Sequence, residues 1–206
     1  MKHYLFLLFL LLSFNSYAEN TDQKPESISS SSIENYNNYP EKVKKMISIG
    51  LALTQKNIGY KYGSADPTSG GMDCSGTMYY LLSTLGLKEV PRSSNLQYVW
   101  AKEKGHLYLV SSNNLNSPEF SHLHPGDLLF WKGTYKIARD PDVTHVMLYI
   151  GKNKNGDPLM LGASDGRTYK GRQIYGVSVF DFQLPNAESK SKFLGYSCVP
   201  EISCGR

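Results

Sequence analysis

Cys74 has the sequence position that most directly suggests chemistry. It follows Asp73 and precedes Ser75 and Gly76, where a turn-rich stretch gives way to the apolar run "TMYYLL". A cysteine kept for packing would sit inside that run, whereas Cys74 stands at its start. In the first turn of a helix, unpaired backbone N–H groups and the positive end of the helix dipole favour the thiolate. We therefore predict that Cys74 is a nucleophile near neutral pH.

A nucleophilic cysteine needs a base, and histidine is the usual one. After its first eighteen residues the chain has four histidines: His106, His122, His124 and His145. Only His145 lies in a clear strand pattern, "THVMLYIG" at 144–151, where alternate side chains share a face and His145 lies opposite the aliphatic residues. Two interpretations stay open: a base that faces Cys74, or a hydrogen-bonded histidine of the core.

The sequence supports neither a metal site nor a nucleic-acid partner. His122 and His124 flank Leu123 in a loop, and no cysteine or carboxylate cluster completes a zinc site with them. We predict that these histidines are solvated or structural and that the protein needs no metal and no cofactor. The net charge is only +4, and no run of Lys and Arg suggests a nucleic-acid surface.

The first eighteen residues resemble an export signal. Lys2 precedes an unbroken apolar run at 5–12, and Ser16-Tyr17-Ala18 supplies small residues where a signal peptidase reads. The run is much shorter than the roughly 20 apolar residues that cross a bilayer, so a retained anchor is the less favoured interpretation. We predict a signal peptide at 1–18, a mature chain that starts at Glu19 without stable membrane insertion, and a periplasmic or secreted location.

Three cysteines leave one thiol unpaired in an exported protein. Cys198 and Cys204 lie close together near Pro200 and Gly205, which favours a short loop closed by a disulfide. Cys74 is then the free thiol.

The remaining pattern predicts helices first and strands after. A Ser- and Asn-rich stretch at 19–39 is expected to be a flexible leader, and the folded domain is expected to span 40–206. Helices are predicted from Pro40 to about 57–59, from Cys74 to a stop at Gly86, and over 95–102. Strands are predicted at 127–131, 144–151, 158–164, 177–182 and 193–199. This order favours an α+β domain in which the N-terminal helices pack on an antiparallel sheet.

Five motifs in chain order resemble the NlpC-type cysteine peptidases, papain-like enzymes that cut peptidoglycan stem peptides. The motifs are "YKYG" (60–63), "DCSG" (73–76), "PRSSNLQ" (91–97), "PGDLLFW" (125–131) and "THVMLYIG" (144–151). Each motif alone is weak, but the set in this order is specific. The resemblance implies a papain-like fold with the nucleophile at a helix N-terminus, Cys74 as nucleophile and His145 as general base.

The resemblance also implies substrate contacts. Tyr60, Asp73 and Ser75 are expected to line the subsite for the free amino end of the stem peptide. Trp131 is expected at the cleft because it ends a strand near the loop that leads to His145.

One position departs from the family pattern. The strand after the base strand normally carries a polar residue, usually His, that orients the catalytic imidazole, and in "LMLGAS" this position falls on Gly162. Loss of such a group costs about 10⁴ in rate in a serine triad. A backbone carbonyl or water, or the side chain of Ser164 or Asp165, is expected to substitute; otherwise the enzyme is weak or inactive.

The sequence therefore predicts an exported cysteine endopeptidase that cleaves peptidoglycan stem peptides between D-Glu and the diamino acid. Two alternatives remain: a catalytically weak or inactive cell-wall binding or regulatory module, supported by Gly162, and an amidase or acyltransferase on the same scaffold.

Overall fold

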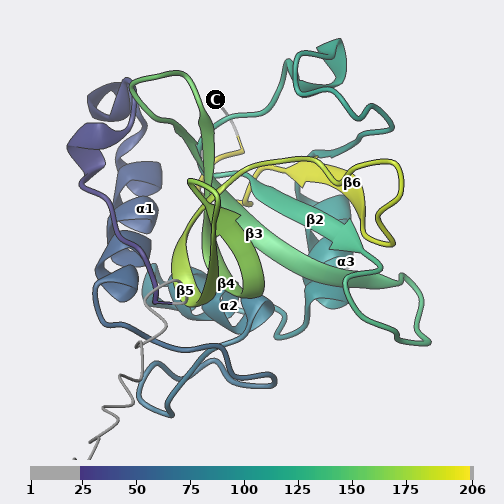
Figure 1. The fold of residues 1–206 in the computed structure, drawn as a ribbon, viewed down its shortest axis with the longest axis horizontal. Helices are drawn as coiled ribbons and strands as arrows, with labels where there is room; N and C mark the ends of the chain where they lie inside the picture. Colours follow the sequence, from purple (N-terminus) through teal and green to yellow (C-terminus); the bar gives the residue numbers. More distant parts are fainter. Residues whose placement is uncertain (1–23, 205–206) are drawn as a thin grey trace, which may run out of the picture.

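Within the described residues 24–204 of the computed structural model, one antiparallel sheet of six strands packs against three α-helices (Figure 1). The predicted signal peptide lies outside the described residues. The helices are α1 (Glu41–Thr54), α2 (Cys74–Thr84) and α3 (Ser94–Lys104). The strands are β1 (Leu107–Leu109), β2 (Leu128–Lys132), β3 (Val143–Lys152), β4 (Pro158–Tyr169), β5 (Arg172–Asp181) and β6 (Lys192–Ser197). The predicted α+β class is confirmed.

The sheet order is β1-β6-β2-β3-β4-β5, so β3 lies inside the sheet between β2 and β4. The register of β2 and β3 pairs Trp131 with His145. Strand β4 is longer than the sequence predicts because it continues past Ser164 to Tyr169 and pairs there with β5. The additional strand β1 has only three residues, too short a stretch for an alternating pattern to appear.

The helices pack where their apolar residues predict. Helix α1 buries Val43, Met46, Ile47 and Leu51 at helical spacing and contacts β4 and β5. Helices α2 and α3 both contact β3, and Figure 1 shows them behind the middle of the sheet. The start of α2 is thereby brought to the strand that carries His145.

Residues 24–39 are not the flexible leader that the sequence predicts. The backbone N–H of Val179 in β5 donates to the carbonyl of Glu26 over 3.1 Å, and the N–H of Glu34 donates to the carbonyl of Lys152 over 2.8 Å. Ile33 is buried in the main core. Composition alone misses this packing because the segment has few apolar residues, yet these are placed against the sheet. The folded domain therefore includes residues 24–39.

A disulfide joins Cys198 and Cys204 and closes a loop after β6. Cys74 is the free cysteine, and it is buried. Of the helices in the described part of the chain, none is sufficiently long and apolar to span a membrane.

Candidate active site

Asp73 fixes the position at which α2 begins. It has extended backbone geometry, and its Oδ1 accepts a hydrogen bond of 2.6 Å from the backbone N–H of Gly76, as an N-cap residue does. Cys74 is therefore the first residue of the helix, as predicted. Within residues 24–204 the backbone N–H of Cys74 has no acceptor, which leaves it available to a bound group.

The Asp73 carboxylate is already saturated with donors. Arg92 binds it in a bidentate manner, with Nη1 at 3.1 Å from Oδ1 and Nη2 at 2.9 Å from Oδ2. The backbone N–H of Gly63 and the hydroxyl of Ser75 donate to it as well, over 2.7 and 3.2 Å. Asp73 thus ties the loop at Gly63, the start of α2 and Arg92 together, and little of its carboxylate remains for a ligand.

A small cavity of about 210 Å³ adjoins the predicted nucleophile. Cys74 lines it together with Tyr60, Asp73 and Ser75, so the structure brings together the residues expected at the amino-end subsite. Burial is the main cause that raises the pKa of Tyr60, and negative charge on Cys74 would raise it further. The Tyr60 phenol therefore keeps its proton and can donate a hydrogen bond into the cavity.

His145 lies on β3, the strand against which the helix of Cys74 packs. The backbone N–H of Val146, the next residue on the strand, is among the groups that lower the pKa of the Cys74 thiol. His145 is 6% exposed, and its ring meets Trp131 edge-on with 5.7 Å between the ring centroids. Burial holds the pKa of His145 well below its usual value, and the positive charge of Arg167 lowers it further. The imidazole is therefore neutral at pH 7.

Burial also changes the expected state of Cys74. The sequence predicts a thiolate near neutral pH from the helix start, but desolvation raises the pKa of Cys74 to about 11. The backbone N–H groups of Val146 and Ser75 and the charge of Arg167 lower this pKa, whereas the charge of Asp73 raises it. Desolvation outweighs the helix start because Cys74 is only 6% exposed. The resting pair is a neutral thiol and a neutral imidazole.

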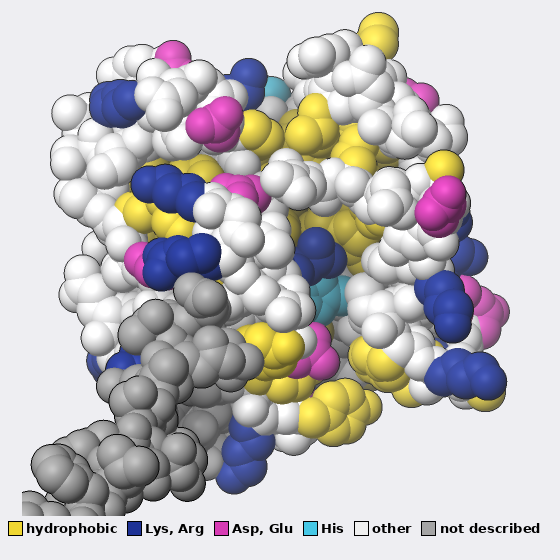
Figure 2. Space-filling view, in the orientation of Figure 1, with side chains coloured by type: hydrophobic (Ala, Val, Ile, Leu, Met, Phe, Trp, Pro, Cys, Tyr) yellow, Lys and Arg dark blue, Asp and Glu magenta, His cyan; other side chains and the backbone are white. Residues whose placement is uncertain are grey.

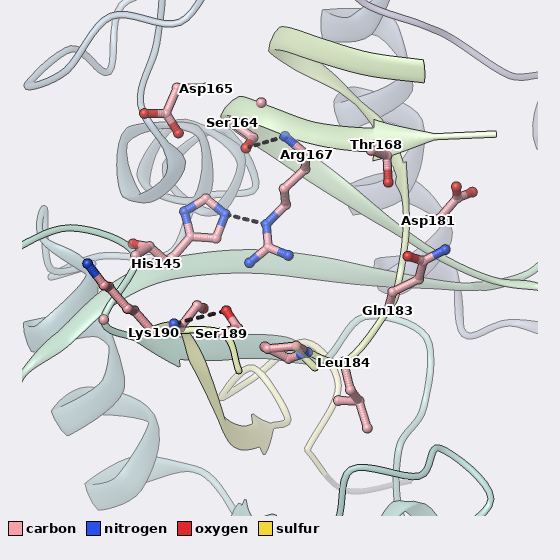
Figure 3. Close-up of a pocket in the computed structure, with 15 residues that line it drawn as sticks. His145, Ser164, Asp165, Arg167, Thr168, Asp181, Gln183, Leu184, Ser189 and Lys190 are labelled. Carbon is pink, nitrogen blue, oxygen red and sulfur yellow. Dashed lines mark hydrogen bonds between the residues drawn. The ribbon is translucent and has the colours of Figure 1, made fainter. Parts of the chain in front are cut away.

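Arg167 is the site residue that sequence reasoning missed. Its Nε–H donates a hydrogen bond of 3.1 Å to Nε2 of His145 (Figure 3). Its guanidinium lies over the Trp131 ring at 4.2 Å from the centroid. Burial lowers the pKa of Arg167 to about 10, so the group remains charged at pH 7. The only sequence signal was a basic residue shortly after the predicted strand at 158–164.

Neither predicted substitute for the orienting side chain contacts the His145 ring. The Ser164 hydroxyl instead accepts a hydrogen bond of 3.2 Å from the backbone N–H of Arg167. Asp165 is exposed, and its side chain points away from the guanidinium of Arg167 (Figure 3). The imidazole is thus contacted by Arg167, a hydrogen-bond donor from further along β4. We expected a hydrogen-bond acceptor at this position.

A side chain at Gly162 would have to displace Met147. A Cβ built at this position would lie 2.7 Å from Sδ of Met147, and 3.2 and 3.6 Å from Cε of Met147 and of Met78. Both methionines are buried. The volume that an orienting side chain would fill is occupied by Met147.

Trp131 does not reach the cleft surface as the sequence predicts. It is fully buried, and it contacts Phe182 and Phe193 as well as His145. Its burial follows from its position in β2, which lies between β3 and β6. Trp131 is therefore a support beneath Arg167 and His145.

His145 and Arg167 line a second, larger cavity of about 630 Å³. Its wall also includes Asp165, Asp181 and Lys190. Figure 2 shows a hollow near the middle of this face, where a basic side chain and a histidine lie over hydrophobic side chains. The predicted nucleophile lines one cavity and the predicted base lines the other, so a ligand that spans both would pass the Cys74 sulfur.

The other histidines take no part in this site. His122 stacks on Tyr108, and Nδ1 of His124 lies 2.8 Å from the carbonyl of His122. His106, Cys198 and Cys204 bring one nitrogen and two sulfurs within 4.8 Å of one another, but the sulfurs are joined in the disulfide and so offer no thiolate to a metal.

Comparisons with known proteins identify the family of the chain. Murein DD-endopeptidase MepH of Escherichia coli (strain K12) is 30% identical over 115 residues, which are 55% of this chain and 36% of MepH, so the chain spans about a third of that relative. A crystal structure from Staphylococcus aureus subsp. aureus Mu50, described as similar to a lipoprotein of the NLP/P60 family, has the same fold. It superposes with a TM-score of 0.53 at 20% identity and covers 86% of this chain and 44% of its own. The NlpC/P60 family matches residues 57–176, more than half of the chain and both Cys74 and His145, and the chain therefore belongs to the NlpC/P60 family.

Proposed function

We propose that this protein is an exported cysteine endopeptidase that cleaves peptidoglycan stem peptides, with Cys74 as nucleophile and His145 as general base. The supporting observation is their placement: Cys74 begins α2, and α2 packs against β3, the strand that carries His145. Each of the two side chains lines a cavity, and the substrate peptide is assigned to both cavities.

In the first half of the reaction, His145 takes the Sγ proton of Cys74 while the sulfur attacks the amide carbonyl carbon. The carbonyl oxygen becomes an oxyanion, for which the free backbone N–H of Cys74 and the phenol of Tyr60 are candidate donors. As the C–N bond breaks, the imidazolium gives its proton to the leaving amine. The acyl group remains on Cys74 as a thioester.

In the second half, His145 removes a proton from a water molecule, which attacks the thioester carbonyl. The C–S bond breaks and the sulfur recovers the proton from the imidazolium. The products are a carboxylic acid and the free enzyme. Because both groups are neutral at rest, the Sγ proton moves to His145 as the sulfur attacks.

For the scissile bond we propose the amide between D-Glu and the diamino acid of the stem peptide. The name of the relative MepH instead specifies DD-endopeptidase action on murein, so the bond is a question for experiment. The amino half of the peptide is assigned to the cavity of Tyr60, Asp73 and Ser75. We assign the protein to the periplasm or the exterior, and N-terminal sequencing of the mature chain should give Glu19 as the first residue.

A weak or inactive wall-binding module is the second candidate, because Arg167 donates to the nitrogen that an orienting group would leave protonated. An amidase or acyltransferase on the same scaffold differs only in the leaving group or the acceptor. Digestion of purified muropeptides with mass analysis separates these functions.

The proposal expects peptides cut after D-Glu, with no cleavage by Cys74→Ala or His145→Ala. Cleavage at a DD bond would correct the bond alone, and release of the intact stem peptide from the sugar would indicate an amidase. Absence of cleavage with retained binding to peptidoglycan sacculi would overturn the enzyme in favour of the module.

A further inference from the structure

We propose that Arg167 is a positioning residue: it controls the protonation of the His145 ring and binds a carboxylate on the leaving half of the peptide. In the free protein it holds His145 in a form that accepts no proton, and the substrate carboxylate draws the guanidinium away. This inference rests on the proposed peptidase function.

The contact with His145 determines where the imidazole carries its proton. Every polar hydrogen of a guanidinium is a donor, so Nε2 of His145 must use its lone pair to accept from Nε of Arg167. The neutral ring then carries its hydrogen on Nδ1, and no nitrogen is left to accept the Cys74 proton. A second proton on Nε2 would place two N–H groups against each other. Arg167 must therefore move before His145 can act as a base.

The guanidinium has donors to spare. Besides Nε, neither of its terminal nitrogens donates to any group within residues 24–204, and no carboxylate of this part of the chain forms an ion pair with it. These nitrogens are not sealed from solvent, since Arg167 is partly exposed and lines the larger cavity. The terminal nitrogens of an arginine can donate two parallel hydrogen bonds to the oxygens of a carboxylate.

A β-bulge aims Arg167 at the site. The pairing of β4 with β5 shifts register between Asp165 and Arg167, and the intervening Gly166 has φ +135°. A Cβ at Gly166 would lie 2.7 Å from Nε2 of Gln173, so glycine suits the position for both space and backbone. The extra residue turns Arg167 toward His145, which a regular strand would not do.

The larger cavity is the side on which a leaving group would lie. His145 must give its proton to the departing amine, and it lines this cavity, whereas Cys74 lines the other. The charged groups on the cavity wall are Arg167, Lys190, Asp165 and Asp181. Asp181 accepts from the backbone N–H of Lys170, and the amino group of Lys190 points away from the guanidinium (Figure 3). Arg167 is therefore the cation best placed for the carboxylate of a diamino acid.

Alkylation of Cys74 tests this without any peptidase activity. Iodoacetamide is neutral and iodoacetate carries a carboxylate, and each joins its CH₂ to sulfur with loss of iodide. In the wild type at pH 7 we expect the rate ratio of iodoacetate to iodoacetamide to exceed that of free cysteine by about tenfold. A ratio equal to or below that of free cysteine would overturn the proposal.

Arg167→Gln supplies the opposite test. Its amide oxygen can accept from His145 and favour the basic tautomer, so we expect iodoacetamide to react at least about tenfold faster than with the wild type. The preference for iodoacetate should be lost, and Arg167→Lys should retain part of it. Lys190→Gln is the matched control, because it removes a cation from the same cavity and should change the ratio less than about twofold. Slower iodoacetamide reaction in Arg167→Gln would overturn the restraint, because Arg167 would then promote ionisation of Cys74, through its charge or through the base.

Synthetic stem peptides that end in the diamino acid, as free acid or as amide, extend the test to turnover. The wild type should prefer the acid in kcat/KM by at least about tenfold, mainly through KM, and Arg167→Gln should show a ratio near one. Equal kcat/KM for both peptides in the wild type would refute the proposal that Arg167 binds the carboxylate of the diamino acid. If the wild type cleaves neither peptide, the proposed function fails while the alkylation ratios still decide the role of Arg167.

Discussion

Gly162→His, which restores the family's orienting residue, should damage this protein. The new Cβ alone would lie 2.7 Å from Sδ of Met147, about 1 Å inside ordinary contact distance, before any ring atom is added. Met147 is fully buried and Met78 is 1% exposed, so neither can move into solvent. Overpacking of this kind costs about 1–3 kcal/mol. In a domain of this size it should lower the melting temperature by about 2–12 °C.

A double-mutant cycle in thermal unfolding identifies the cause. Met147→Ala alone should cost about 2–5 kcal/mol because it leaves a cavity in the core. In Met147→Ala/Gly162→His the ring can use that space, so the double variant should be more stable than the sum of the single effects by about 1 kcal/mol or more. Gly162→Ala, which adds only the Cβ, should lie between the wild type and Gly162→His.

Muropeptide turnover completes the test. We expect Gly162→His to lower activity or leave it unchanged, because Met147 fills the position and Arg167 still holds Nε2 of His145. A Gly162→His variant that is as stable as the wild type and turns over tenfold faster would refute this reasoning. It would mean that the wild type has low turnover because it lacks a histidine at position 162.

Three further predictions follow from the same contacts. Asp73→Ala should lower the free energy of unfolding by about 2–5 kcal/mol in urea titrations, because it removes the helix cap and leaves Arg92 without its partner. Cys198→Ser/Cys204→Ser should cost about 2 kcal/mol, since the disulfide closes a loop of sequence separation 6, and should leave turnover unchanged. The folded-state pKa of Cys74 is raised to about 11, so its stabilisation is complete below the unfolded value near 8.5 and is lost as the pH rises toward 11. The stability difference between the wild type and Cys74→Ser should therefore fall by on the order of 2–3 kcal/mol across that range, and a constant difference would show that Cys74 ionises normally.

The sequence was sufficient where the signal is local. Asp73, Cys74 and Gly76 form a helix start within four residues, and the alternation around His145 is contained in one strand, so both elements could be predicted from short windows. The resemblance to a family brought the two together. The packing of residues 24–39 could not be predicted in this way because Ile33 contacts strands far along the chain.

The states of the site residues were harder to predict than their positions. Cys74 was expected as a thiolate from its helix start, but the burial that raises its pKa comes from the whole fold. Trp131 was expected at the cleft because it ends a strand, yet its neighbours from β6 and the segment after β5 cover it. A pattern in one segment does not report what other segments place against it.

In the proposed site, the side chain that contacts the imidazole comes from further along β4 than the family pattern predicts. The Met147 side chain fills the space beside Gly162, so a side chain at position 162 would have to displace it. The bulge at Gly166 then supplies a side chain from position 167 to the same imidazole. A histidine at position 162 would steady an imidazolium, whereas an arginine that donates to Nε2 favours the neutral ring. If His145 is the base, the exchange makes its action depend on what binds the guanidinium of Arg167. A protein that shows no activity without an anionic ligand can then still be an enzyme.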